Sequence, residues 1–101
     1  MIRALPLLTC LALSGPALAQ GAAATCAAME RDGRLGPLTP AACRCHYAVA
    51  QDVLDPDIRA LLFDSWLNGS DTAKQVEALK PRRRVQDQLE NMLVTAKARC
   101  S

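Results

Sequence analysis

The sequence has little of the chemistry that enzymes use. It contains one histidine, His46, and no Gly-rich elbow, Ser-x-x-Lys motif or pair of carboxylates accompanies it, so nucleophilic and general acid–base catalysis lack their usual groups. Asp52, Asp55 and Asp57 lie close together, but two of them occupy a predicted helix junction, where aspartate caps a helix and interacts favourably with its dipole. We therefore predict a protein that is not an enzyme and needs no cofactor.

The sequence also lacks an excess of charge, β-strand patterns and a membrane-spanning run. Its 12 Lys and Arg residues nearly balance 10 Asp and Glu residues, so there is no general electrostatic reason to bind nucleic acid. No stretch alternates apolar and polar residues with a period of two, which excludes a sheet. The apolar run at residues 5–13 is far shorter than the roughly 20 residues that a bilayer crossing needs.

Residues 1–19 have the features of a cleavable signal peptide. Arg3 provides the positive charge near the N-terminus, residues 5–13 the apolar segment, and Ala17-Leu18-Ala19 the small residues of the cleavage site. We predict that residues 1–19 are removed and that residues 20–101 form a single domain. This domain would lie in the periplasm of a Gram-negative bacterium or outside the cell, and it would contain no transmembrane segment.

The remaining domain has few large apolar side chains. Its 82 residues include 20 apolar side chains larger than alanine, with cysteine left out of the count, and such a core is marginal without covalent support. Removal of the signal peptide also removes Cys10. Four cysteines remain, namely Cys26, Cys43, Cys45 and Cys100. An even number of cysteines in an exported chain of this length predicts two disulfides.

Residues that start and end helices divide the domain into helical segments. Proline follows both Thr39 and Asp55, and each pair supplies an N-cap and a first-turn proline. Gly69 takes the position where a left-handed residue ends a helix. Ser70, Asp71 or Thr72 can cap the next helix, and Thr72 and Gln75 have capping-box spacing. The predicted order is a loose leader at 20–25, helices at about 25–31, 40–54 and 56–68, a short helix that ends at residue 80, and a final helix of about 18 residues that ends near residue 100. We therefore predict an all-α fold, a small bundle of four to five helices stapled by two disulfides.

The predicted helix at 40–54 limits the disulfide pairing. Cys43 and Cys45 point about 200° apart on a helix, so they cannot bond to each other. Two pairings stay open: Cys26–Cys43 with Cys45–Cys100, or Cys26–Cys45 with Cys43–Cys100. In either case this helix is apolar over more than half of its circumference, which predicts a central helix with neighbours on two sides, each attached by one disulfide.

The final predicted helix has an apolar stripe that can face the central helix. The stripe consists of Val85, Leu89, Met92, Leu93, Ala96 and Cys100. In an antiparallel pair, the register with Cys43 opposite Cys100 aligns residues 47/96, 50/93 and 54/89. The register with Cys45 opposite Cys100 aligns 49/96 and 53/92. By this small margin we prefer Cys26–Cys45 and Cys43–Cys100.

The cysteine spacing and helix order resemble those of a known group of proteins. Cys26 leads, Cys43-Arg44-Cys45 opens an amphipathic helix, Phe63 and Trp66 lie on the next helix, and a basic segment precedes Cys100 near the C-terminal end. This arrangement is similar to that of a functionally uncharacterised group of small exported alphaproteobacterial proteins, some of which carry the automatic name arginine transporter. The resemblance implies a helical, disulfide-bonded envelope protein. A domain without a membrane-spanning segment cannot itself translocate a solute.

Cys43, Cys45 and His46 offer an alternative role in metal or redox handling. The segment is one residue shorter than the C-x-x-C-H haem motif. On a helix Cys43 faces away from Cys45 and His46, so a shared metal would require the first turn to unwind. Two disulfides explain the cysteines more simply, so we predict no metal site and expect His46 to be a partly buried structural residue.

Two features are candidate interaction surfaces. Arg82, Arg83 and Arg84 place positive charge at a helix N-terminus, where the dipole disfavours it, and they would suit an acidic protein or an anionic envelope component. Phe63 and Leu67 lie opposite the main apolar side of their helix, so they either pack under another helix or form an exposed patch. The sequence thus predicts a non-enzymatic periplasmic binding module, chaperone-like or inhibitor- or immunity-like, whose partner it does not identify.

Overall fold

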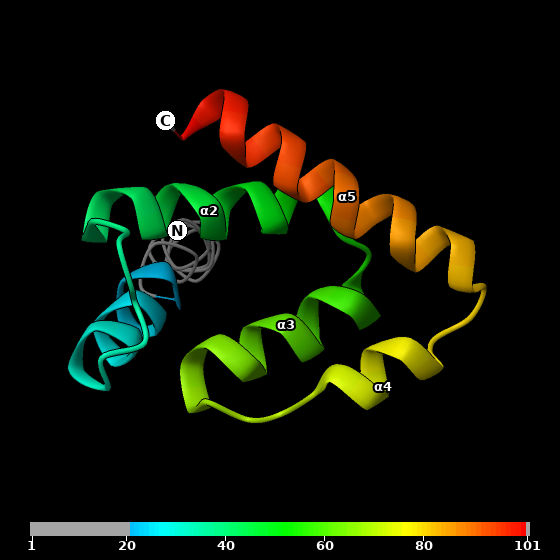
Figure 1. Cartoon of the computed structure of the whole chain (residues 1–101), viewed down its shortest axis with the longest axis horizontal. Helices are drawn as coiled ribbons and strands as arrows, with labels where there is room; N and C mark the ends of the chain where they lie inside the picture. Colours follow the sequence, from blue (N-terminus) through cyan, green and yellow to red (C-terminus); the bar gives the residue numbers. More distant parts are fainter. Residues whose placement is uncertain (1–20, 101) are drawn as a thin grey trace, which may run out of the picture.

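The regular secondary structure of the described residues is helical. The computed structural model describes residues 21–100, which form five helices and, within that range, no strand; the predicted signal peptide at 1–19 lies outside the described residues. Residues 21–31 form the N-terminal helix, and four helices follow it (Figure 1): α2 (Pro40–Val53), α3 (Pro56–Asn68), α4 (Ala73–Ala78) and α5 (Arg82–Arg99). The predicted all-α fold with two disulfides is confirmed.

The predicted signals for α2 and α3 act as expected, except that the Asp55 side chain makes no cap to α3. Thr39 Oγ1 accepts a hydrogen bond from the Ala42 N–H at 3.1 Å, and Pro40 opens α2. Pro56 opens α3 in the same way. Gly69 ends α3 with a φ of 71°, a left-handed conformation that glycine adopts without a Cβ clash. The observed ends of α2, α3 and α5 lie within about one residue of the predicted ones.

The prediction of a loose leader at residues 20–25 is wrong for the part that the structure describes. Residues 21–25 belong to the N-terminal helix. Gly21 lies against the Tyr47 ring, where a Cβ would come within 2.9 Å of the hydroxyl oxygen, and Thr25 is buried. Tertiary packing against α2 therefore extends a helix that local sequence signals begin later.

The predicted capping box at the start of α4 does not form. Thr72 Oγ1 donates a hydrogen bond to the Leu61 carbonyl at 3.1 Å and makes no side-chain cap to α4. Asp71, another of the three cap candidates, accepts a hydrogen bond from the Ala73 N–H at 3.3 Å through its Oδ1. α4 is six residues long and ends at Ala78, two residues before the predicted end.

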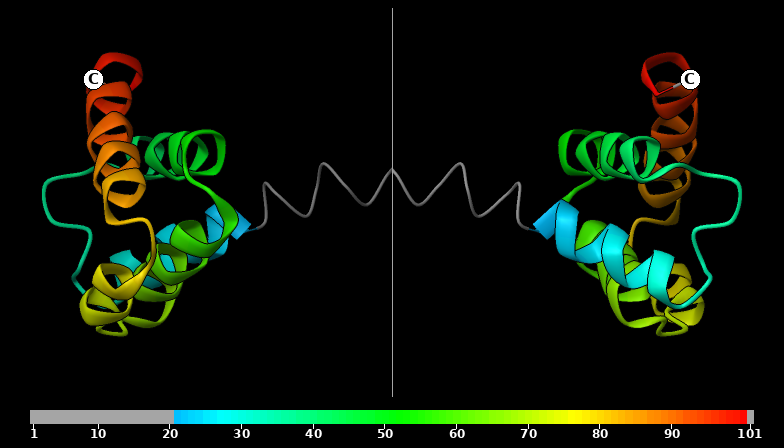
Figure 2. Two further views of the ribbon diagram at one scale, coloured as in Figure 1. Left: turned by 90° about the vertical axis from the view of Figure 1, so that its right-hand side faces the viewer. Right: turned by 90° about the vertical axis from the view of Figure 1, so that its left-hand side faces the viewer.

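The helices lie in two layers. α2 and α5 cross as an antiparallel pair in one layer, and the N-terminal helix, α3 and α4 form the other (Figures 1 and 2). The core between them consists of Val49, Ala50, Leu54, Ile58, Val85, Met92 and Ala96. No helix among residues 21–100 is long and apolar enough to cross a membrane.

The structure corrects the preferred disulfide pairing. The bonds are Cys26–Cys43 and Cys45–Cys100, the other of the two pairings that the sequence left open. The correction extends to the packing of α5, because Leu93, which the preferred register placed in the helix interface, is 64 % exposed. The adjacent Met92 is buried in the core instead.

The physical reason is that α2 has two apolar stripes, one with Cys43 and Tyr47 and the other with Cys45 and Val49, and these stripes face different neighbours. Cys43 bonds the N-terminal helix, and Tyr47 on the same stripe stacks on Phe63 of α3 with ring centroids 4.0 Å apart. Cys45 bonds the end of α5 through Cys100. The predicted central helix with one disulfide on each side is therefore confirmed. The error lies in which side of α2 faces which neighbour: the Cys43 side faces the N-terminal helix, and the Cys45 side faces α5.

Candidate binding groove

A cavity of about 440 Å³ opens between α3, α4 and α5. We call it the apolar groove, because its lining includes the side chains of Ile58, Leu62, Ala73, Val76 and Leu89. The polar residues that line it are Ser65, Ser70, Asp71, Thr72 and Glu77. Its volume lies within the range of roughly 300–1,000 Å³ that is typical of small-molecule sites.

The groove stays open because α4 packs only lightly. None of the residues of α4 is buried, and Val76 meets the core only at its edge. Gly69 turns the chain after α3, and the hydrogen bond from Thr72 to the Leu61 carbonyl holds the start of α4 against α3. A six-residue helix gains little stability from its own hydrogen bonds, so these tertiary contacts place it.

The charged side chains that line the groove are both acidic. Asp71 and Glu77 are exposed, and neither forms an ion pair within residues 21–100. Lys74 precedes Glu77 by one helical turn but is not paired with it in the described chain. The groove thus combines an apolar lining with two carboxylates that form no ion pair in the described chain.

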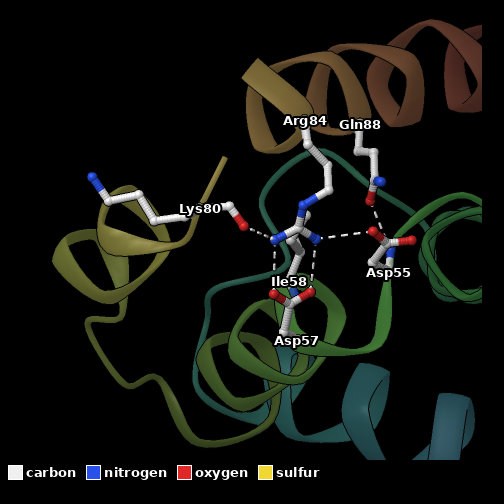
Figure 3. A network of polar contacts seen from close by, with 6 residues as sticks. All are labelled: Asp55, Asp57, Ile58, Lys80, Arg84 and Gln88. Atoms are coloured by element: carbon white, nitrogen blue, oxygen red, sulfur yellow. Dashed lines mark hydrogen bonds and ion pairs between the residues drawn. The ribbon is translucent and has the colours of Figure 1, made fainter. Parts of the chain in front are cut away.

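The arginine surface predicted from the sequence is only partly available to a partner, because one of its three arginines is used in contacts within the protein. Arg84 forms ion pairs with Asp55 and Asp57, each at 2.9 Å, and donates a further hydrogen bond to the Lys80 carbonyl at 2.7 Å (Figure 3). Only 24 % of its side chain is exposed. Arg84 therefore joins the N-terminal ends of α3 and α5, while Arg82 and Arg83 remain exposed.

The same contacts change the role expected for the aspartates. The Gln88 side chain and the Arg84 guanidinium lower the pKa of Asp55, and Arg84 together with the Ile58 N–H lowers the pKa of Asp57. Asp57 Oδ1 accepts from that N–H at 2.9 Å, but the Asp55 side chain makes no cap to α3. The capping interpretation is therefore wrong for the Asp55 side chain, because its carboxylate is used by Arg84.

The Phe63 and Leu67 pair does not form one exposed patch. Phe63 stacks on Tyr47 and also contacts Trp66, with ring centroids 5.7 Å apart, so it is half-buried inside the molecule. Leu67 is 41 % exposed. Of the two interpretations that the sequence left open, the structure supports packing between helices for Phe63.

All four cysteines of the predicted domain are in disulfides. His46 is half-buried and lines a small cavity of about 90 Å³ with Met29, Leu38 and Trp66. Within residues 21–100 no group of three or more His, Cys, Asp and Glu side chains is placed to hold a metal ion. Binding of a metal by Cys43, Cys45 and His46 would require both disulfides to open.

Arg34 makes structural contacts that were not predicted from the sequence. Its guanidinium donates to the carbonyls of Ser65 at 3.3 Å and Trp66 at 2.9 Å, and it pairs with Asp32 at 3.0 Å. It thereby satisfies carbonyls in the last turn of α3, where a positive charge is favourable. The partner is more than thirty residues away in sequence, so no local signal pointed to it.

Comparisons with known protein families, with curated proteins and with solved structures find no match for this chain.

Proposed function

We propose that this protein is a non-enzymatic binding module of the bacterial cell envelope, and that its apolar groove receives the apolar part of a ligand. The proposal includes export and removal of residues 1–19, with the mature domain in the periplasm or outside the cell. It also includes membership of the alphaproteobacterial group that the cysteine spacing resembles. Shielding an apolar group from water is a chaperone-like activity, which keeps the proposal within the class predicted from the sequence.

The observation that carries the proposal is the groove itself. Val76 and Leu89 approach it from different helices, and Ile58 and Leu62 line it from α3. Apolar surface of this kind gains free energy when a ligand covers it, in proportion to the area removed from water. A closed packing of α4 would have buried this surface within the chain, but α4 has no buried residue.

The test is to fill the groove with a side chain. Val76→Trp places an indole in the groove, and Val94→Trp is the matched control because Val94 is 62 % exposed on α5 and does not line the groove. We expect Val76→Trp to weaken binding of a neutral apolar probe, 1-octanol, at least tenfold and Val94→Trp to leave it unchanged. Equal binding by the two variants, with both shown to be folded by circular dichroism, would contradict the proposal.

A further inference from the structure

The charges at the groove indicate which head group its ligand carries. Asp71 and Glu77 contribute two carboxylates to the lining, and the structure places no lysine or arginine among the lining residues. Of the cations at the start of α5, Arg84 is held by two carboxylates and cannot serve an anionic ligand without breaking both ion pairs. An anionic amphiphile would therefore meet repulsion at the groove, and a cationic one would meet attraction.

We propose that the apolar groove binds a small amphiphilic cation, an amine or quaternary ammonium joined to an alkyl chain. The inference rests on the proposed function and adds the ligand class to it. The alkyl chain covers Leu62, Val76 and Leu89, while the head group lies beside Asp71 and Glu77 at the groove. The alkyl chain then provides most of the affinity and the head group adds a preference, because the carboxylates are exposed and each exposed ion pair contributes little alone.

The experiment compares three probes that share an eight-carbon chain: octyltrimethylammonium, 1-octanol and octyl sulfate. Isothermal titration of the oxidised protein at low salt, below the micelle concentration of each probe, gives the three dissociation constants. We expect the cation to bind about threefold to tenfold more tightly than 1-octanol, as two exposed carboxylates allow, and the sulfate to bind more weakly than either. Tetramethylammonium, which has no chain, should not bind measurably.

The double variant Asp71→Asn/Glu77→Gln should remove the preference for the cation and leave the affinity for 1-octanol unchanged. Asp87→Asn/Glu90→Gln is the matched control, because it removes two exposed carboxylates of α5 that do not line the groove. Added salt should reduce the preference in the wild-type protein but not in the first variant.

The outcomes separate the inference from the proposed function. If 1-octanol binds in the groove but the cation binds no better, the ligand class is wrong and the binding function stands. The ligand class is also wrong if the control variant loses the preference as fully as Asp71→Asn/Glu77→Gln does. If no probe binds, or if Val76→Trp binds all of them unchanged, both the inference and the proposed function fail.

Discussion

The two ends of the α2–α5 pair are held by different kinds of interaction. At one end, which we call the stapled end, Cys26–Cys43 and Cys45–Cys100 connect α2 to the N-terminal helix and to the end of α5. At the other, the ionic end, Arg84 joins Asp55 and Asp57, and Gln88 Oε1 accepts from the Asp55 N–H at 2.7 Å. The stapled end therefore depends on redox conditions, and the ionic end depends on pH and salt.

The difference indicates which part of this small domain can open most easily. The disulfides compensate for a core of few large side chains, and both cysteines of Cys26–Cys43 are buried. The groove and α4 lie away from them, and Ile58 at the groove directly follows Asp57 of the ionic end. Elements with few buried contacts open most easily, so under the proposed function we expect a ligand to enter beside α4 without disturbing the stapled end.

Removal of the disulfides should have the largest effect on stability. Cys45–Cys100 spans 55 residues, and its loss through Cys45→Ala/Cys100→Ala should cost about 4 kcal/mol in the chain-entropy description. Cys26–Cys43 spans 17, and Cys26→Ala/Cys43→Ala should cost about 3 kcal/mol. Urea unfolding of both variants measures the two losses in the free energy of unfolding and shows which is larger. A reversed order, or a wild-type midpoint that reductant does not change, would contradict this account of the stapled end.

Two neighbouring residues test the register that the disulfides impose on α5. Met92 is buried in the core, so Met92→Ala should lower the free energy of unfolding by about 2 kcal/mol. Leu93 is 64 % exposed, so Leu93→Ala should change it by less than about 0.5 kcal/mol. Urea unfolding of these two variants measures both values, and a larger loss from Leu93→Ala would restore the register that the sequence favoured.

Loss of the Arg84 charge should have a smaller effect. Arg84→Met keeps the apolar part of the side chain and removes the ion pairs to Asp55 and Asp57. We expect a fall in Tm of a few degrees, less than for either disulfide variant, because the aspartates are partly exposed. Arg83→Met is the control, since Arg83 is exposed and unpaired in the described chain. Equal Tm values for the two variants would show that the ionic end contributes no stability.

The smallest effect should be the pH dependence of the stabilisation that the Arg84 ion pairs provide. Folding lowers the pKa of Asp55 and of Asp57 below the ordinary value of 3.8, so their ion pairs stabilise the protein fully above that value. As the pH falls below it, the unfolded chain takes up protons first and the stabilisation decreases. The Tm difference between wild type and Arg84→Met should therefore be constant from pH 7 to pH 5 and shrink towards pH 3. A difference that grows on acidification would contradict the assignment.

Local signals made the boundaries of α2 and α3 predictable, whereas contacts between distant residues were not predictable. Thr39, Pro56 and Gly69 act within a few residues of their own positions, and the helices that they bound were predicted correctly. The disulfide pairing depends on which side of α2 faces α5, and both sides carry apolar residues, so two registers fitted the sequence.

The candidate site was less predictable than the helices. The groove depends on how far α4 stands from α3, which a hydrogen bond from Thr72 to the Leu61 carbonyl sets across eleven residues. Arg84 was correctly recognised as unusual at a helix N-terminus, but its partners lie 27 and 29 residues away. The charge pattern in the sequence therefore indicated an exposed surface where the fold forms an internal connection.

The most direct test of the central claim is to map where an apolar ligand binds. Amide chemical shifts of the oxidised, isotopically labelled protein can be followed during titration with 1-octanol. We predict saturable shifts in the second half of α3, in residues 70–77 and around Leu89, and none near Cys45 and Cys100 at the stapled end. Shifts that centre on the stapled end, or that spread over the whole surface without saturation, would contradict a ligand site in the apolar groove.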